Sequence, residues 1–179
     1  MLLLSLINFE KLKRAVLHFA VVLVVLALQN LLFSQIRPLG VAAMFVPAVV
    51  VAIGLFEGGV WGGVFGVVTG ILCGMRYSGC LVLFPVLFAI FGFFTGLLTQ
   101  FFLNKRFFPY YVLCVCAFLL TAFCQMFRPL FITGAPFFAV LRTGLLQVVW
   151  SLPFPFLIYF PIKNIVRKQD KLTSPARKG

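Results

Sequence analysis

The stretch Glu57–Gly74, EGGVWGGVFGVVTGILCG, repeats glycine at four-residue spacing. Residues four apart on a helix lie nearly above one another, so these glycines form one smooth face. In water each glycine inside a helix costs roughly 1 kcal/mol relative to alanine. In a bilayer the same face lets a second helix approach closely. The pattern therefore predicts close helix–helix packing within a membrane through Gly58, Gly62, Gly66, Gly70 and Gly74.

The composition agrees with a membrane setting. Hydrophobic residues make up 63% of the 179 positions and charged residues 10%, against about 25% charged in a soluble domain. Mean hydropathy is +1.16. The net charge of +12 comes from basic residues that lie between apolar runs and at the two ends. This placement argues against nucleic-acid binding and predicts contact with membrane lipid.

Six apolar runs predict an all-α, polytopic membrane protein with six transmembrane helices. We expect a cytoplasmic or interfacial N-terminal segment at 1–14, a six-helix transmembrane domain at 15–162, and a basic, disordered cytoplasmic tail at 163–179. The fourth run carries a second pair of small residues suited to close packing, Gly92 and Gly96. The spans are expected near 15–33, 39–56, a third ending near 74, 80–103, 108–127 and 139–162. The second and third are short, so a re-entrant hairpin is the alternative there.

The distribution of basic residues predicts the orientation. Six spans place both termini on one side, and that side then holds eleven basic residues: Lys11, Lys13, Arg14, Lys105, Arg106, Lys163, Arg167, Lys168, Lys171, Arg177 and Lys178. The opposite side holds four: Arg37, Arg76, Arg128 and Arg142. Positively charged loops stay in the cytoplasm, so both termini are predicted to be cytoplasmic.

Groups able to perform catalysis are few. The acids are Glu10, Glu57 and Asp170, and the one histidine is His18. We expect the negative charge of Glu57 to stabilise the N-terminus of the third helix. The alternative is a proton-coupling role for this carboxylate. We expect His18 to lie at the level of the lipid headgroups. The sequence has no Walker loop, nucleophile elbow or paired carboxylates. We predict that the protein is not an enzyme and needs no cofactor.

The five cysteines show no CxxC spacing and no neighbouring histidine or carboxylate. A zinc site needs about four convergent ligands, so we predict no metal site and expect buried, apolar cysteines. A disulfide between Cys73 and Cys80, which flank a short loop, stays open because sequence does not establish the geometry.

Three glutamines fall at similar depth near the outer ends of their spans. With the four outer arginines they form a predicted outer polar notch, made of Gln29, Arg37, Arg76, Gln125, Arg128, Arg142 and Gln147. In one interpretation the amides pair with neighbouring helices and the arginines reach headgroups. In the other, the notch binds a partner's helix or a small solute.

The chain resembles the rod shape-determining membrane protein family, MreD, over roughly residues 15–168. The shared features are a first span ending LALQN, a second span containing Pro47, the turn and glycine helix LFEGGVWGGVFGVVTGIL, and a last span broken by prolines before a basic tail. Family members often carry an acid after that proline, where this chain has Ala48, and an Asp at the end of the glycine helix, where it reads Cys73-Gly74-Met75-Arg76.

The resemblance implies a component of the bacterial inner (cytoplasmic) membrane that serves cell elongation and peptidoglycan synthesis. Such proteins are non-catalytic partners of the single-span protein MreC, and act alongside the MreB filament and the wall-synthesis enzymes. Our hypothesis is that the glycine face supports packing and that the outer notch receives MreC. The alternative is the substrate-binding membrane subunit of a small-solute or vitamin importer. Such subunits commonly show an Ala-x-x-x-Ala face in the first span, which Ala15, Ala20 and Ala27 do not form.

Overall fold

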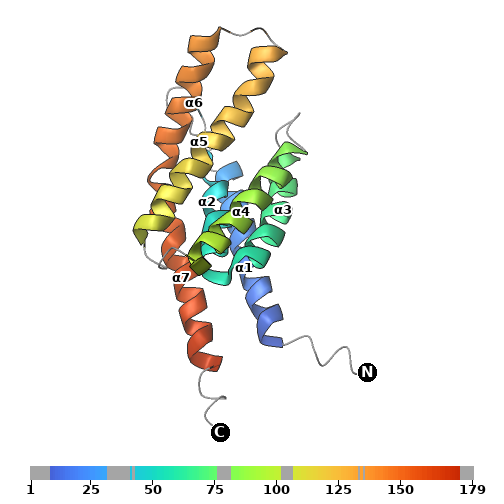
Figure 1. Ribbon diagram of the computed structural model, residues 1–179, viewed down its shortest axis with the longest axis vertical. Helices are drawn as coiled ribbons and strands as arrows, with labels where there is room; N and C mark the ends of the chain where they lie inside the picture. The colour runs from blue at the N-terminus through green and yellow to red at the C-terminus, as the bar shows by residue number, and fades with distance from the viewer. Residues whose placement is uncertain are drawn as a thin grey trace.

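The computed structural model describes residues 9–31, 41, 43–75, 82–101, 107–132, 134 and 136–173. This part of the chain forms seven helices and no strand, so the all-α prediction is confirmed. In chain order the helices are α1 (Phe9–Leu31), α2 (Val46–Glu57), α3 (Gly59–Gly74), α4 (Leu83–Phe101), α5 (Phe107–Phe131), α6 (Phe137–Ser151) and α7 (Phe154–Thr173). Figure 1 shows that α1 begins and α7 ends at the same end of the molecule.

Helix α2 is the centre of the bundle. Its residues from Val46 to Phe56 are all buried, and it packs against α1, α3, α4, α5 and α7, as expected of a helix that is apolar on every side. Pro47 lies in the first turn, where its fixed φ and missing N–H suit a helix start. The helix therefore begins at Val46, and the predicted start near residue 39 is wrong. It ends at a turn in which Gly58 has φ 98°, a conformation that favours glycine.

Helices α3 and α4 pack against each other through their glycines and run antiparallel. A Cβ added to Gly62, Gly66 or Gly70 would overlap backbone atoms of α4, so no side chain separates the two backbones. Such close approach increases dispersion contacts and Cα–H···O contacts. The facing pairs are, in order, Gly59–Gly96, Gly62–Gly92, Gly66–Phe88 and Gly70–Pro85.

The predicted sixth span consists of two helices. The axes of α6 and α7 differ by 42° at a break that contains Pro153, whose ring and missing N–H disfavour a continuous helix. Helix α7 continues to Thr173, so the prediction of a disordered tail is wrong for residues 163–173. Lys, Arg and Gln are good helix formers, and extending an existing helix avoids the cost of nucleation. Helix α1 likewise includes residues 9–14, so the expected boundary at Ala15 falls inside a helix.

An aromatic cluster joins α2, α5 and α7. The Tyr159 ring centroid lies 5.2 Å from that of Tyr110, 5.3 Å from that of Phe107 and 5.5 Å from that of Phe56. The Tyr110 hydroxyl donates a hydrogen bond to the carbonyl oxygen of Ala48 at 3.2 Å. A buried phenol needs such a partner, and here the partner belongs to the central helix. The cluster thus fastens α5 and α7 to α2.

Several helices are suited to crossing a membrane. The segment Leu12–Leu31, α4 and α5 are each long and apolar enough, and α6 with α7 to Val166 makes a fourth span if the bent pair counts as one. Helices α2 and α3 have 12 and 16 residues. At ~1.5 Å per residue they measure about 18 and 24 Å, less than the roughly 30 Å of hydrocarbon. The described residues therefore support a multi-pass membrane protein.

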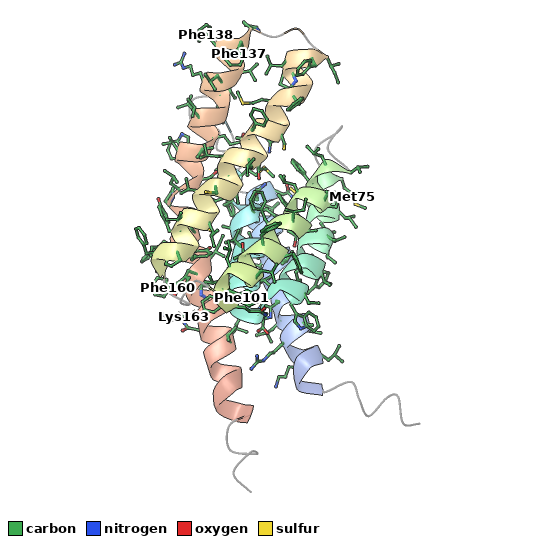
Figure 2. All side chains as sticks on the ribbon, in the orientation of Figure 1. Met75, Phe101, Phe137, Phe138, Phe160 and Lys163 are labelled. Atoms are coloured by element: carbon green, nitrogen blue, oxygen red, sulfur yellow. The ribbon has the colours of Figure 1, made fainter. Side chains whose placement is uncertain are left out.

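The outside of the bundle is apolar. Large hydrophobic side chains are exposed on all seven helices except α2. Figure 2 labels five of these exposed residues, with Phe137 and Phe138 near one end of the molecule and Met75, Phe101 and Phe160 around its middle part. A surface of this kind would associate in water, whereas lipid tails solvate it.

Candidate functional site

The start of α2 is buried, and its backbone N–H groups are satisfied by other helices. The first N–H groups of a helix have no partner inside it, and Phe45, which precedes α2, has no side chain able to cap it. The Gln29 side chain of α1 takes that role, since its Oε1 accepts from the N–H groups of Phe45 and Val46, each at 3.2 Å. The N–H of Ala48 donates to the Phe45 carbonyl at 3.0 Å. An unsatisfied N–H in an apolar interior costs several kcal/mol, so Gln29 has a structural function.

Helices α5 and α6 reach the same segment through a chain of polar contacts. The N–H of Met44 donates to Ser151 Oγ at 2.9 Å, and that hydroxyl donates to the carbonyl of Gln147 at 2.8 Å. The Gln147 side-chain amide donates to Gln125 Oε1 at 3.3 Å. The Gln125 amide in turn donates to Met44 Sδ. Three helices thus converge on residues 44–46.

An open cavity of about 270 Å³ lies between α5 and α6, which we name the α5–α6 cleft. Gln125, Gln147 and Thr143 are its polar wall, and the remaining wall is apolar. A separate, much smaller cavity of about 10 Å³ has Gln147 and Ser151 in its lining. The cleft is lined by Ala122, Gln125, Met126, Pro129, Ala139, Val140, Thr143, Gly144 and Gln147.

The structure brings together only part of the predicted notch. Gln125 and Gln147 are hydrogen-bonded to each other, and Gln29 contacts the same 44–46 segment from α1. Arg142 is exposed on α6. Arg37, Arg76 and the side chain of Arg128 lie outside the described residues. The three amides therefore pair within the chain, and the Gln125–Gln147 pair also lines the cleft.

The glycines of the predicted interface face inward. Gly62, Gly66 and Gly70 contact α4, Gly92 also contacts Gly54 of α2, and Gly96 lies against Gly59. Gly58 forms the α2–α3 turn, and Gly74 is buried at the end of α3. A partner helix would have to separate α3 from α4 to reach this face. The glycine face is used inside the chain.

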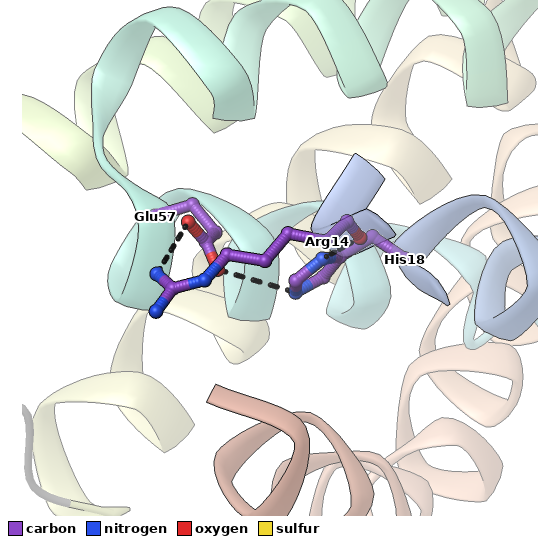
Figure 3. Close-up of polar contacts among 3 residues, drawn as sticks. All are labelled: Arg14, His18 and Glu57. Carbon is purple, nitrogen blue, oxygen red and sulfur yellow. Dashed lines mark hydrogen bonds and ion pairs between the residues drawn. The ribbon is translucent and has the colours of Figure 1, made fainter. Parts of the chain in front are cut away.

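A second polar cluster joins the start of α1 to the α2–α3 turn (Figure 3). Arg14 Nη1 lies 3.6 Å from Glu57 Oε2, and His18 Nε2 lies 3.7 Å from Glu57 Oε1. His18 is 1% exposed, so its ring is buried between helices, and its expected depth at headgroup level stays a prediction. Glu57 ends α2 and contacts α1, and the α3 start has no side-chain cap. The expected role of Glu57 at the N-terminus of α3 is therefore replaced by these contacts.

Some residues of the polar chain were not predicted. Ser151 follows Gln147 by four positions and therefore shares its helix face, which is a detectable signal. Met44 carries no such signal, because its contribution comes from a backbone N–H and a thioether.

Within the described residues no group of three or more His, Cys, Asp or Glu side chains could hold a metal ion. Cys73 and Cys114 are buried, Cys124 is half-buried and Cys116 is exposed, so the expectation of buried cysteines is wrong for Cys116. Cys80 lies outside the described residues, so the predicted possibility of a Cys73–Cys80 disulfide also lies outside them. Comparison of the chain with protein-family models, with curated proteins and with solved structures finds no match.

Proposed function

We propose that the chain is a non-catalytic, multi-pass component of the bacterial inner membrane that serves cell elongation and binds a single-span, MreC-like partner through helix packing. The observation that carries the proposal is the α5–α6 cleft, an opening of about 270 Å³ with two glutamines and a threonine on an otherwise apolar wall. A partner helix gains dispersion contacts there, and a polar side chain on it gains an amide partner. MreB-like filaments and wall-synthesis enzymes would be reached through that partner or directly.

Six passes with both termini cytoplasmic belong to this proposal. The direction of the chain supports it: Gln29, near the end of α1, meets the start of α2, and Glu57, at the end of α2, returns to the start of α1. The glycine pairs make α3 and α4 antiparallel. Short helices such as α2 and α3 cross where the bilayer thins locally. The sequence then gives eleven basic residues on the proposed cytoplasmic side and four on the opposite side, and this difference supports the orientation.

The cleft is the better partner site because the glycine face is already covered. Helix α6 packs on α5, and several of its other side chains, including Leu145 and Val149, are exposed. Gly144 borders the cleft, and the nearest atom to a Cβ added there is Met126 Sδ at 3.2 Å. A flexible thioether adapts to different neighbours. The cleft can therefore adjust to an incoming helix.

The test is co-purification from native membranes in mild detergent with a tag on the C-terminus. Wild-type protein should recover a single-span coiled-coil protein, and Gly144→Leu, which fills the cleft, should reduce recovery roughly tenfold, equivalent to about 1.4 kcal/mol. Leu145→Phe is the matched control, since it adds bulk to an exposed position on the same helix. Equal recovery by both variants, at equal expression, would contradict the cleft as the partner site.

A small-solute importer subunit is the second candidate, and the cleft also favours it. Its volume is close to the lower end of the roughly 300–1,000 Å³ of small-molecule pockets, and its amides can bind a polar solute. Recovery of a coupling subunit with paired ATPases, or of a bound small molecule, would replace the scaffold proposal with this one.

A further inference from the structure

The exposed apolar surface of α4 and that of α7 end at one level of the molecule. Phe101, at the end of α4, and Phe160 of α7 are both exposed, and Figure 2 shows them at a similar height, next to Lys163. Beyond Phe160, the described side chains of α7 include no exposed large apolar residue. Apolar surface gives way to charged residues where the hydrocarbon of a bilayer meets the headgroups. This level therefore marks one edge of the hydrocarbon layer.

Helix α7 continues past this level as a basic helix. Ile162 and Val166 are buried and mark the side of α7 that packs on the bundle. Lys163, Arg167 and Lys171 follow one another at four-residue spacing and so share a helix face, which lies about 60–140° around the axis from Val166. We name these three positions the α7 basic face. It borders the buried side of the helix.

The α7 basic face begins at the depth of the lipid headgroups. Lys163 is half-buried, and its Nζ lies 5.1 Å from the centroid of the Tyr159 ring, a cation–π contact. At ~1.5 Å per residue, Arg167 lies about 6 Å and Lys171 about 12 Å further along the axis. A headgroup layer is roughly 5–8 Å thick, and charges act over about 8 Å more at physiological salt. All three positions are therefore within electrostatic reach of lipid phosphates.

The neighbouring charges add to the positive potential. Figure 1 shows that α1 begins at the end of the molecule where α7 ends, and the first turns of α1 carry three further basic residues. Glu57 lies 3.6 Å from one of them, Arg14. All three acids of the chain lie in these segments, yet seven basic residues outnumber them. The basic residues are Lys11, Lys13, Arg14, Lys163, Arg167, Lys168 and Lys171, and the acids are Glu10, Glu57 and Asp170.

We propose that the α7 basic face is a docking surface for anionic phospholipids in the membrane leaflet at this end of the molecule. Ammonium and guanidinium groups donate charge-assisted hydrogen bonds to phosphate oxygens. A zwitterionic lipid carries its own cation beside the phosphate, so the net attraction depends on an anionic headgroup. An acidic protein segment would also be attracted to these charges, but it would not require them to begin where the apolar surface ends. The inference needs only a membrane setting and does not depend on the proposed partner.

The test uses the full purified chain in phosphatidylcholine bilayers with a trace of spin-labelled lipid. Electron paramagnetic resonance measures how strongly the protein immobilises labelled phosphatidylglycerol and labelled phosphatidylcholine. We expect a preference of about fivefold or more for phosphatidylglycerol, the factor that a single basic residue contributes near an anionic surface. In roughly 1 M salt, where the Debye length is about 3 Å, the preference should largely disappear. Equal association of the two lipids at low salt would overturn the proposal.

A charge-removing triple variant assigns the preference to α7. Lys163→Gln, Arg167→Gln and Lys171→Gln together remove the charge of the basic face and keep good helix formers. The matched control, Lys163→Arg with Arg167→Lys and Lys171→Arg, keeps the charge and changes the side chains. We expect the glutamine variant to lose most of the preference and the control to retain it. A wild-type preference in the glutamine variant would overturn the proposal.

A single substitution keeps the proposal testable if the triple variant does not fold. Lys163→Gln should lower the preference by roughly twofold or more, whereas Arg142→Gln, which removes one charge from an exposed position on α6, should leave it unchanged. Equal preferences in the two variants would overturn the proposal. Co-purification with Gly144→Leu tests the proposed partner separately, so either idea can fail alone. An acidic protein that is recovered with wild type and lost with the glutamine variant, in the absence of a lipid preference, would assign the face to a protein instead.

Discussion

The α3–α4 pair and the α5–α6 pair are both antiparallel, yet the first pair is held by backbone contacts and the second by side-chain contacts. Glycines bring the backbones of α3 and α4 together, and the interface has no room for even a methyl group at Gly62. Side chains separate α5 from α6, and the hydrogen-bonded pair Gln125 and Gln147 lines an open cavity of about 270 Å³ between them. The backbone contacts make the α3–α4 interface rigid, whereas the side chains between α5 and α6 can rearrange when a partner binds.

The largest expected loss of stability is in the glycine-lined interface between α3 and α4. Gly62→Ala should destabilise the protein by about 3 kcal/mol, because the new methyl group overlaps backbone atoms that cannot move alone. The measurement is equilibrium unfolding in mixed micelles.

Gly63→Ala is the matched control for that change. A Cβ at Gly63 would lie 3.7 Å from Phe93 Cβ, an ordinary contact, so this change should be neutral or stabilise by up to about 1 kcal/mol. Similar losses of stability in Gly62→Ala and Gly63→Ala would contradict the conclusion that backbone contact at Gly62 holds α3 against α4. By the same reasoning, Gly66→Leu combined with Gly70→Leu should unfold the protein, because both added side chains would overlap backbone atoms of α4.

The next prediction compares the stability contribution of the buried Gln29 cap with that of the Gln147 hydrogen bond at the cleft. Gln29→Met removes the acceptor for two buried N–H groups and should cost about 2–4 kcal/mol. Gln147→Met removes one amide contact beside an open cavity and should cost about 0.6 kcal/mol, the average for such bonds in membranes. Equilibrium unfolding of the two variants under identical conditions measures the two free-energy costs. Equal costs would mean that the start of α2 finds other partners.

The smallest effect is expected in the cleft wall. Gly144→Ala places a methyl group near Met126 Sδ, at 3.2 Å, and the thioether can turn away. Stability should change by less than about 0.5 kcal/mol, measured beside Gly62→Ala. A loss as large as at Gly62 would show that α5 and α6 are as rigidly joined as α3 and α4.

Much of the helical pattern could be predicted locally. Gly58 and Pro153 are backbone signals, and they correctly indicated the turn after α2 and the bend in the last span. The start of α2 was misplaced because the sequence 39–45 is as apolar as the helix itself. Hydropathy does not distinguish a buried helix from a buried connection such as residues 43–45. The helical tail was missed because its charges resemble those of disordered segments, although its residues favour helix once α7 is in place.

The candidate sites were harder to predict than the helices. Depth along each span grouped Gln29, Gln125 and Gln147, and in the structure all three belong to the contacts around residues 44–46. Their separate functions could not be predicted: Gln29 caps α2, and the other two line a cleft. The sequence places His18 near the start of the first span, but it does not show which face of that helix turns inward. A lone histidine and a lone acid 39 positions apart in the chain give no sign of contact until helix directions are known.

The amino-acid sequence alone determined that the chain is helical, membrane-suited and built around a glycine-faced helix, because these properties depend on hydropathy and on the four-residue spacing of small side chains. Only the tertiary structure decided that the glycine face is covered by α4, that α1 supplies the cap of α2, and that His18 meets Glu57. These outcomes depend on how each helix is rotated about its axis. In a chain whose lipid-facing and buried surfaces are equally apolar, that rotation is set by contacts between helices and not by composition.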